Sequence, residues 1–233
     1  MESSVLVSCL CVTRNRVPLL RRSVACFLNQ TFAPRELVIQ YEADDPATQR
    51  YVATLDDPRI RGLEIPASPR LRLGERRNRA VEAARGRYIA QWDDDDWHGP
   101  TRLAEQFAAL RDSAKHGCVL WRVVLFDSTT GRGYISEGRP CEGTLVAERD
   151  KVPAFAELGR GEDEHAIRKM IEADALAALD RPLLYVYVYH GSNTSGRTHF
   201  KKRLFAHAQP LGAADEERVR AALSGLVVDI VEQ

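Results

Sequence analysis

The sequence predicts an α/β protein built on a mostly parallel central sheet that is flanked by helices. Strand and helix signals alternate at short intervals through the first half of the chain, as they do in βαβ units. The 233 residues, 44% of them hydrophobic and 28% charged, are enough to bury the core of one domain or of two closely packed halves. In addition, an acidic run directly follows a predicted strand, where open α/β sheets bind their ligands.

The first predicted strand is the apolar run of residues 5–12, which ends at a polar turn. Pro18 suits the start of a helix, and Leu20, Val24 and Phe27 follow it at helical spacing. The same two kinds of pattern define the other elements of the first half. These are strands over residues 37–40, 60–65 and 88–92 and helices over residues 46–55 and 74–85.

The second half of the chain is less regular. Its patterns predict helices over residues 100–114 and 162–179 and strands over residues 118–126, 144–147 and 183–189. In the last strand Tyr185, Tyr187 and Tyr189 alternate with aliphatic residues, so the two kinds should face opposite sides of a sheet. The chain after His199 gives no clear pattern, except that the apolar residues 226–231 could form an edge strand that pairs with a second copy in a homodimer.

The composition excludes several classes of protein. Lys plus Arg equals 33 and Asp plus Glu equals 33, so bulk charge does not favour binding to nucleic acid. No apolar run approaches the roughly 20 residues of a membrane helix and no signal peptide stands out, so we expect a cytoplasmic protein whose membrane contact, if any, is peripheral. The five cysteines lack metal-ligand spacing, and we expect Cys9 and Cys11 to be small core residues.

Four consecutive aspartates, Asp93, Asp94, Asp95 and Asp96, follow the strand predicted over residues 88–92. Carboxylates about 4 Å apart repel by roughly 4 kcal/mol at an effective dielectric near 20, so a positive charge should lie among them. Carboxylate and water oxygens suit Mg²⁺ or Mn²⁺, whose shell substrate phosphates can complete. The alternative is a solvated acidic turn that caps the helix beginning near Pro100.

Short motifs surround the acidic run. They are residues 74–78, 84–90, 93–97, Pro100, 102–103 and Gln106, with residues 7–16 and 29–37 before them and 161–163 after them. In order and spacing these motifs resemble the family 2 glycosyltransferases over about residues 5–190. The resemblance implies a GT-A fold, in which a Rossmann-like, mostly parallel central sheet is joined by a smaller mixed region on the acceptor side.

The resemblance also implies a metal site that grips a nucleotide-diphosphate sugar through Mn²⁺ or Mg²⁺. It makes Asp95 the metal ligand, Asp94 the ribose contact and Asp93 a supporting acid. His190 follows the last predicted strand, where related enzymes can supply a further ligand to the metal or the diphosphate. A metal on the diphosphate would neutralise charge that develops on the leaving group.

The other site residues implied by the resemblance come from both halves of the chain. Asp163 is the candidate general base, at a predicted helix N-terminus that favours the ionised carboxylate, and Glu162 beside it orients the acceptor or supports the loop. Arg77 matches a position near the base and phosphates, with Arg72 as its substitute, and a guanidinium suits that role. Thr13 matches a nucleoside contact.

The chain departs from the family where paired aspartates usually hold the base. It has Glu42 and Asp44 there, and Glu42 aligns better with the base-contacting acid, while Asp44 could replace it. The resemblance further implies that residues 1–98 bind the nucleotide sugar, that residues 99–200 bind the acceptor and carry the base, and that residues 201–233 form a C-terminal extension.

Together these features predict an inverting glycosyltransferase with a nucleotide-diphosphate donor, most simply a UDP-sugar. The acceptor is a hydroxyl of a glycan, a lipid-linked sugar or a small molecule. One alternative is a sugar-phosphate nucleotidyltransferase, but the turn at residues 13–16 lacks the glycines that let backbone amides reach a triphosphate. The second alternative is a non-catalytic module that binds the nucleotide in the same pocket. Such a module would bind a donor without hydrolysing it.

Overall fold

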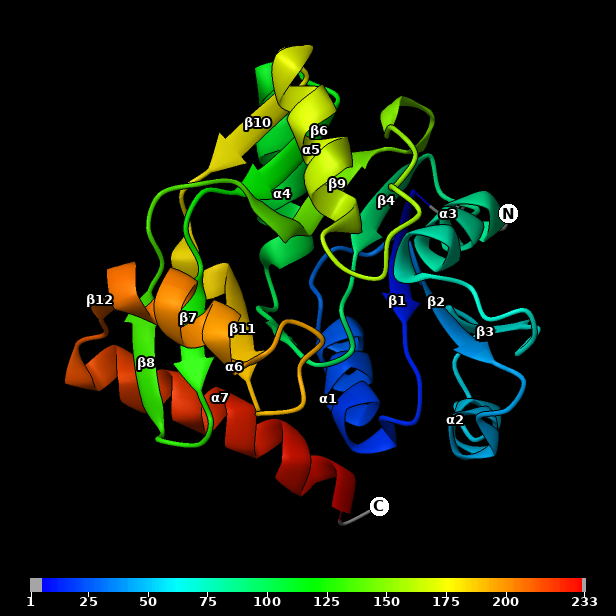
Figure 1. Ribbon diagram of the computed structural model, residues 1–233, viewed down its shortest axis with the longest axis horizontal. Helices are drawn as coiled ribbons and strands as arrows, with labels where there is room; N and C mark the ends of the chain where they lie inside the picture. The colour runs from blue at the N-terminus through cyan, green and yellow to red at the C-terminus, as the bar shows by residue number, and fades with distance from the viewer. Residues whose placement is uncertain (1–5, 232–233) are drawn as a thin grey trace.

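A seven-stranded sheet forms the centre of the computed structural model, which describes residues 6–231 (Figure 1). Its strand order is β10-β6-β9-β4-β1-β2-β3. Adjacent strands are parallel, except that β9 is antiparallel to both β4 and β6. The strands are β1 (Val7–Val12), β2 (Arg35–Glu42), β3 (Ile60–Ile65), β4 (Tyr88–Gln91), β6 (Gly117–Leu120), β9 (Cys141–Glu148) and β10 (Leu176–Leu179). The predicted mostly parallel central sheet is therefore confirmed.

Helices cover both faces of this sheet. One core takes side chains from α1 (Val17–Leu28), α2 (Pro46–Ala53) and α4 (Arg102–Ser113), and the opposite face packs against α3 (Leu73–Ala83) and α5 (Glu162–Glu172). Because both faces are buried, β1 is a continuous apolar run rather than an alternating one. Its Cys9 and Cys11 lie in the first core, as predicted.

A second, smaller sheet of mixed direction has the strand order β12-β8-β7-β11-β5. Its strands are β5 (Trp97–His98), β7 (Val124–Asp127), β8 (Arg132–Ile135), β11 (Tyr185–Tyr189) and β12 (Gln209–Pro210). In β11, Tyr185 and Tyr187 pack into one core and Val186 and Val188 into another, which confirms the predicted alternation. The expected smaller mixed region is therefore present.

The single strand predicted over residues 118–126 is wrong, because it is two strands in two sheets. The chain leaves the large sheet after β6 and enters the small one at β7. Between them the Arg122 guanidinium binds both carboxylate oxygens of Asp180 at 2.8 Å, and the amide of Trp121 donates to the carbonyl of Leu179. These contacts with the segment after β10 hold the crossing from one sheet to the other.

The helix predicted over residues 162–179 is also wrong in its second half. α5 ends at Glu172, and Asp174 takes a left-handed conformation with φ of 51°. The amide of Ala175 then donates to the carbonyl of Met170 at 2.8 Å, which closes the helix end. The chain continues as β10, which pairs in parallel with β6, so tertiary pairing overrides the local helical pattern.

The C-terminal part after β11 is helical. It consists of α6 (Arg197–His199), the short helical turns η3 (Phe200–Leu204) and η4 (Phe205–His207), and, after β12, the long helix α7 (Ala213–Val231). The edge strand predicted over residues 226–231 is wrong, because this backbone continues α7, whose Val219 is buried against the small sheet. The homodimer itself stays a prediction.

Two further short turns complete the structure, η1 (Arg149–Lys151) and η2 (Pro182–Leu184). None of the helices in residues 6–231 combines the length and apolar character needed to cross a bilayer.

Candidate active site

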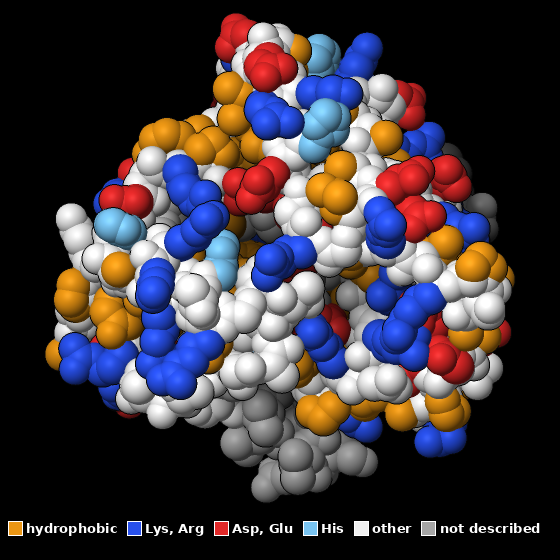
Figure 2. Space-filling view, in the orientation of Figure 1, with side chains coloured by type: hydrophobic (Ala, Val, Ile, Leu, Met, Phe, Trp, Pro, Cys, Tyr) orange, Lys and Arg blue, Asp and Glu red, His pale blue; other side chains and the backbone are white. Residues whose placement is uncertain are grey.

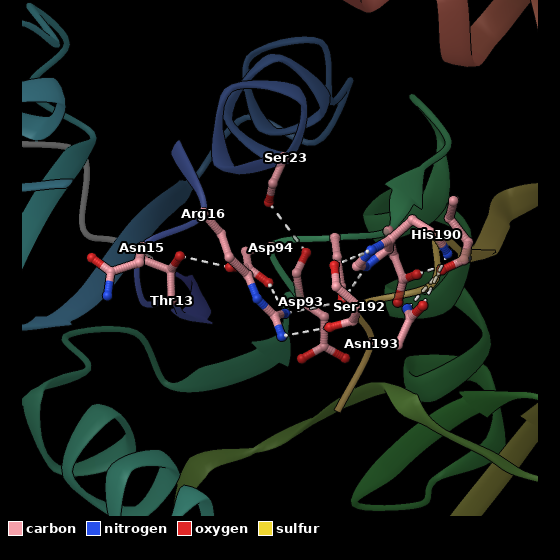
Figure 3. A network of polar contacts seen from close by, with 12 residues as sticks. Thr13, Asn15, Arg16, Ser23, Asp93, Asp94, His190, Ser192 and Asn193 are labelled. Atoms are coloured by element: carbon pink, nitrogen blue, oxygen red, sulfur yellow. Dashed lines mark hydrogen bonds and ion pairs between the residues drawn. The ribbon is translucent and has the colours of Figure 1, made fainter. Parts of the chain in front are cut away.

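Polar side chains converge at the carboxyl ends of β1 and β4, two adjacent strands of the large sheet. The chain leaves β1 toward β2 on one side and returns as β4 on the other, so this is the topological switch point where open α/β sheets bind ligands. The hydroxyl of Thr13, after β1, donates to Oδ2 of Asp94, after β4, at 2.6 Å (Figure 3). The two strand ends are thereby joined through their side chains.

Asp96 has a structural role that separates it from the other three aspartates. Its buried carboxylate accepts hydrogen bonds from the hydroxyl of Tyr185 and, at 2.9 Å, from the backbone amide of Val188. Burial, together with the charges of Asp95 and Asp93, raises the pKa of Asp96 well above its usual range. This side chain therefore fastens the acidic run to β11 and leaves three carboxylates for the site.

The carboxylate of Asp94 is buried between two side chains of the β1–α1 turn. It accepts from Thr13 and lies 3.4 Å from Nη1 of Arg16. Burial, followed by the charge of Asp95, raises the pKa of Asp94 to about 7. Asp94 is only 3% exposed, so little of its surface is open to the ribose contact that the sequence predicts.

Asp95 meets two basic side chains at the same oxygen. Its Oδ2 lies 3.1 Å from Nη1 of Arg16 and 3.2 Å from Nε2 of His190. Burial alone would raise the pKa of Asp95, but the hydrogen bond with His190 and the charge of Arg16 outweigh it, so the pKa is lowered. The carboxylate is therefore ionised and available to a cation.

The loop after β11 orients His190. Nδ1 of His190 lies 2.9 Å from the hydroxyl of Ser192, and its backbone amide donates to Oδ1 of Asn193 at 2.9 Å. Asn193 in turn donates to the carbonyl of Val188. Because a hydroxyl can donate or accept, Ser192 serves either tautomer of the imidazole, including the one whose Nε2 is free to bind a metal.

Arg77 connects the acidic run to the second half of the chain. This buried guanidinium donates to Oδ1 of Asp93 at 2.9 Å and to Oε1 of Glu162 at 2.7 Å. Asn78 beside it exchanges two hydrogen bonds with the backbone of Phe155, in the segment that leads to α5. The adjacent Arg and Asn of this motif therefore both hold α3 against that segment.

Asp163 lies in the first turn of α5, as predicted, and is half-buried. The helix begins after Gly161, whose φ of 71° needs a residue without a side chain. Nε2 of Gln91, the last residue of β4, donates to Oδ2 of Asp163 at 3.2 Å. Glu162 points to Arg77 and is 2% exposed, which favours support of the loop over contact with an acceptor.

The two candidate base-binding acids differ in burial. Glu42 is 1% exposed and its carboxylate contacts Arg14, with Nη1 of Arg76 at 3.8 Å and Nε of Arg70 at 3.9 Å. The side chain of Asp44 is 48% exposed and pairs with Arg14 at 2.8 Å. Both acids are therefore close to the β1–α1 turn, with Glu42 inside a cluster of arginines.

Arg72 lies apart from the acidic run. Its side chain is exposed and donates to the carbonyl of Glu157 at 3.1 Å, while its backbone amide is capped by Glu75 at the start of α3. Of the two arginines proposed for the phosphates, Arg77 alone is seen to contact the acidic run.

Three residues at the site were missed by the sequence analysis. Arg16 contacts Asp94 and Asp95, Gln91 contacts Asp163, and Arg76 donates to the carbonyl of Thr13 at 2.7 Å. Arg16 stands in the polar turn after the first strand, and that position is the only sequence signal it offers. Arg16 and Arg77 supply positive charge among the carboxylates of the acidic run.

The residues present fit a divalent cation held jointly with a ligand. An oxygen and a nitrogen 3.2 Å apart, as in Asp95 and His190, are spaced like neighbouring ligands of one ion with bonds of about 2.1 Å. Among residues 6–231, no three His, Cys, Asp or Glu side chains form a complete metal-binding group. The shell would therefore need further oxygens, which substrate phosphates can supply.

We expect Asp94→Asn to stabilise the metal-free protein at high pH. The pKa of Asp94 is about 7 in the folded protein against 3.8 ordinarily, so between these values the folded state binds more protons and stability falls as pH rises. The free energy of unfolding of the variant should exceed that of the wild type by roughly 2–4 kcal/mol at pH 8 and by little at pH 4.5. Urea unfolding at both pH values checks this, and an equal gain at both would contradict it.

Comparison with known proteins agrees with this geometry. The model of the family described as "Glycosyl transferase family 2" matches residues 8–168. The chain is 32% identical over 121 residues to the putative colanic acid biosynthesis glycosyl transferase WcaA of Escherichia coli, covering 50% of this chain and 42% of WcaA. It is 37% identical over 84 residues to the succinoglycan biosynthesis protein ExoO of Rhizobium meliloti, covering 35% and 23%. The chain thus spans less than half the length of these curated relatives.

Solved structures share the fold. TarS of S. aureus superposes with a TM-score of 0.62 at 15% identity, covering 78% of this chain and 60% of that one. The mannosyltransferase PcManGT of Pyrobaculum calidifontis, solved with GDP-Man and Mn²⁺, gives 0.59 at 18% identity, covering 81% and 57%. The predicted GT-A fold is confirmed by these structural matches. Because the family model matches well over half of the chain, this protein belongs to glycosyl transferase family 2.

Proposed function

We propose that this chain transfers a sugar from a nucleotide-diphosphate donor to a hydroxyl acceptor, with inversion at the anomeric carbon. The observation that carries the proposal is the convergence of Asp95 and His190 at one oxygen–nitrogen pair 3.2 Å apart, at the switch point of the sheet. This pair suits a divalent cation, and Mn²⁺ or Mg²⁺ bound there would neutralise the charge of a departing diphosphate.

In this proposal Asp163 takes the proton of the acceptor hydroxyl. The acceptor oxygen forms its bond to the anomeric carbon as the bond from that carbon to the diphosphate breaks, and the diphosphate keeps the electron pair. Attack opposite the leaving group inverts the configuration. Gln91 holds Oδ2 of Asp163 in the first turn of α5, and this hydrogen bond would orient the carboxylate toward the acceptor.

The donor lies in this proposal across the ends of β1, β2 and β4. Glu42 and the arginines around it would receive the base, Thr13 and Asp94 would meet the nucleoside, and Arg77 would hold Asp93 beside the phosphates. TarS has been solved with UDP and UDP-GlcNAc and PcManGT with GDP-Man, which supports a nucleotide-sugar donor, and a UDP-sugar is the simplest candidate.

The acceptor side is the second half of the chain in this proposal. Residues 1–98 would bind the donor, residues 99–200 would bind a glycan, a lipid-linked sugar or a small molecule and supply the base, and residues 201–233 would extend the acceptor side. The arrangement of the site fits this division, because Thr13, Glu42 and the acidic run come from the first part and Asp163 from the second. A cytoplasmic location agrees with the soluble donor.

We expect Asp95→Ala to weaken metal-dependent binding of UDP by roughly 100-fold, since one of two protein ligands is lost. Isothermal titration calorimetry with UDP, with and without Mn²⁺, measures the effect. Asp56→Ala is a matched control, because Asp56 is an exposed aspartate that lies between α2 and β3, outside the acidic run. If Asp95→Ala bound UDP with Mn²⁺ as tightly as the control, the metal site would lie elsewhere.

A thermal-shift screen of nucleoside diphosphates with Mn²⁺ identifies the base, because a ligand that binds only the folded state raises its apparent stability. Hydrolysis of the corresponding sugar nucleotide is then measured by the release of the nucleoside diphosphate. This measurement distinguishes an enzyme from a non-catalytic binding module. Binding without any turnover in the presence of acceptor extracts would favour the module.

A further inference from the structure

A long stretch of the chain after the candidate metal ligands carries only positive charge. Residues 181–214 contain no aspartate or glutamate, although the whole chain has 33 acidic and 33 basic residues. The stretch includes Arg197, Lys201, Lys202 and Arg203, all of which are exposed in α6 and η3. In a chain of zero net charge, such a segregation creates a local positive potential that the composition as a whole conceals.

The backbone of this basic segment is anchored by its aromatic side chains. The ring of Phe200 packs at 4.8 Å from the rings of both Tyr187 and Tyr189 in β11, and Phe200 is fully buried. Phe205 packs at 5.2 Å from Tyr134 in β8. The apolar side of the segment therefore faces the small sheet, and its cations are left on the outer side.

Two arginines from other parts of the chain extend this surface. Arg139 in the β8–β9 connection and Arg160 before α5 are exposed. Burial and then the charges of Arg139, Arg203 and Arg160 lower the pKa of His199, with the charge of Glu164 acting against them. We call the set of Arg139, Arg160, Arg197, Lys201, Lys202 and Arg203 the basic face. Figure 2 shows Lys and Arg side chains gathered over β7, β8 and α6.

The basic face is largely without counter-charges. Within the part of the chain that the structure describes, no carboxylate lies within 4.0 Å of the cationic groups of its members except Glu142, at 3.8 Å from Arg139. Some other surface arginines pair closely, as Arg122 does with Asp180 at 2.8 Å. Unpaired cations fixed in one surface are available to an external anion.

The basic face also borders the candidate active site. Arg160 precedes Asp163 by three residues, and the basic residues of α6 and η3 follow the loop of His190 and Ser192, which contacts Asp95 and Arg16. An exposed tryptophan accompanies it: Trp121 is 38% exposed, its ring lies against Gly138, and its carbonyl accepts from the amide of Arg139 at 2.9 Å. Indole rings beside basic side chains suit the headgroup region of a bilayer.

We propose that the basic face docks the protein on the surface of a bilayer that contains anionic phospholipids. Phosphate headgroups would pair with the unpaired cations, Trp121 would lie at headgroup level, and the active site would face hydroxyl acceptors held at that surface. The described chain has no membrane-spanning helix, so this contact is peripheral and reversible. The inference goes beyond the proposed transfer reaction and is tested without it.

The experiment is sedimentation of the purified chain with sucrose-loaded vesicles. We expect binding to vesicles of phosphatidylcholine and phosphatidylglycerol at 60:40, none to phosphatidylcholine alone, and weaker binding at 300 mM than at 50 mM NaCl. The triple variant Lys201→Gln, Lys202→Gln, Arg203→Gln should lose roughly 100-fold in partition coefficient. These side chains are exposed, so the fold should tolerate the changes, and a thermal melt verifies that it does.

The matched control is Arg50→Gln, Arg79→Gln, Arg85→Gln. It removes the same number of exposed positive charges from or next to α2 and α3, and should bind the anionic vesicles like the wild type. Equal losses in both triple variants would show a nonspecific charge effect and overturn the proposal. Absence of vesicle binding would also overturn the proposal. The same holds if the chain does not bind vesicles but binds single-stranded RNA through Lys201 and Lys202. Loss of donor turnover plays no part in this test.

Discussion

Asp163→Asn should lower the rate of sugar transfer by roughly 10²–10⁴-fold, because the amide cannot accept the proton of the acceptor hydroxyl. The asparagine has the size of the native side chain, and its oxygen can still accept from Nε2 of Gln91. Binding of the nucleoside diphosphate with Mn²⁺ should be unchanged, since the role proposed for Asp163 is on the acceptor. Initial rates of nucleoside diphosphate release and calorimetry of its binding give the two quantities.

Glu164→Gln provides the control for this experiment. Glu164 is the next residue in the same helical turn, is exposed, and loses the same charge when changed. Its variant should keep the wild-type rate. If Asp163→Asn were active and Glu164→Gln impaired, the base would be misassigned; if neither changed the rate, neither carboxylate would serve as the base.

Arg77→Met should destabilise the fold by roughly 3–5 kcal/mol, because it leaves the buried Glu162 and the half-buried Asp93 as carboxylates without their partner. Burial raises the pKa of both acids, with the charge of Arg77 acting against it. Without Arg77 they should protonate more readily in the folded state, so the loss should be larger at pH 8 than at pH 5.5. Urea unfolding at the two pH values measures both effects.

Arg79→Met is the matched control, since Arg79 lies two residues further along α3 and is exposed. It should change the free energy of unfolding by no more than about 0.5 kcal/mol. Equal losses in the two variants would mean that the Arg77 bridge contributes nothing specific. Arg77→Lys should recover only part of the loss, because an ammonium group lacks the planar fork that meets both carboxylates.

The elements predicted correctly are those whose local pattern agrees with their place in the fold. Strand β1 is apolar because both of its faces are buried, and helix α1 has a buried stripe that includes Leu20, Val24 and Phe27. Residues 118–126 look like one strand because an apolar run does not record which sheet each of its halves joins. Residues 176–179 extend a helical pattern, and only their pairing with β6 makes them a strand.

Short motifs are the source of the candidate site residues. Asp95, Arg77 and Asp163 stand at the positions that the motifs indicate, and the structure connects their neighbourhoods through Arg77, Glu162 and Gln91. The sequence alone cannot show that Arg16 spans Asp94 and Asp95. That contact depends on how two loops meet at the edge of a sheet, because Arg16 is 78 residues from Asp94 and 79 residues from Asp95 in the chain.

The fastening of Asp96 to Tyr185 and Val188 makes the acidic turn dependent on a strand that is synthesised much later. While the chain is still on the ribosome, the first βαβ units can form, but the turn lacks the hydroxyl and amide that hold it. Nascent chains that stop before β11 should therefore fold their first half without ordering the acidic turn.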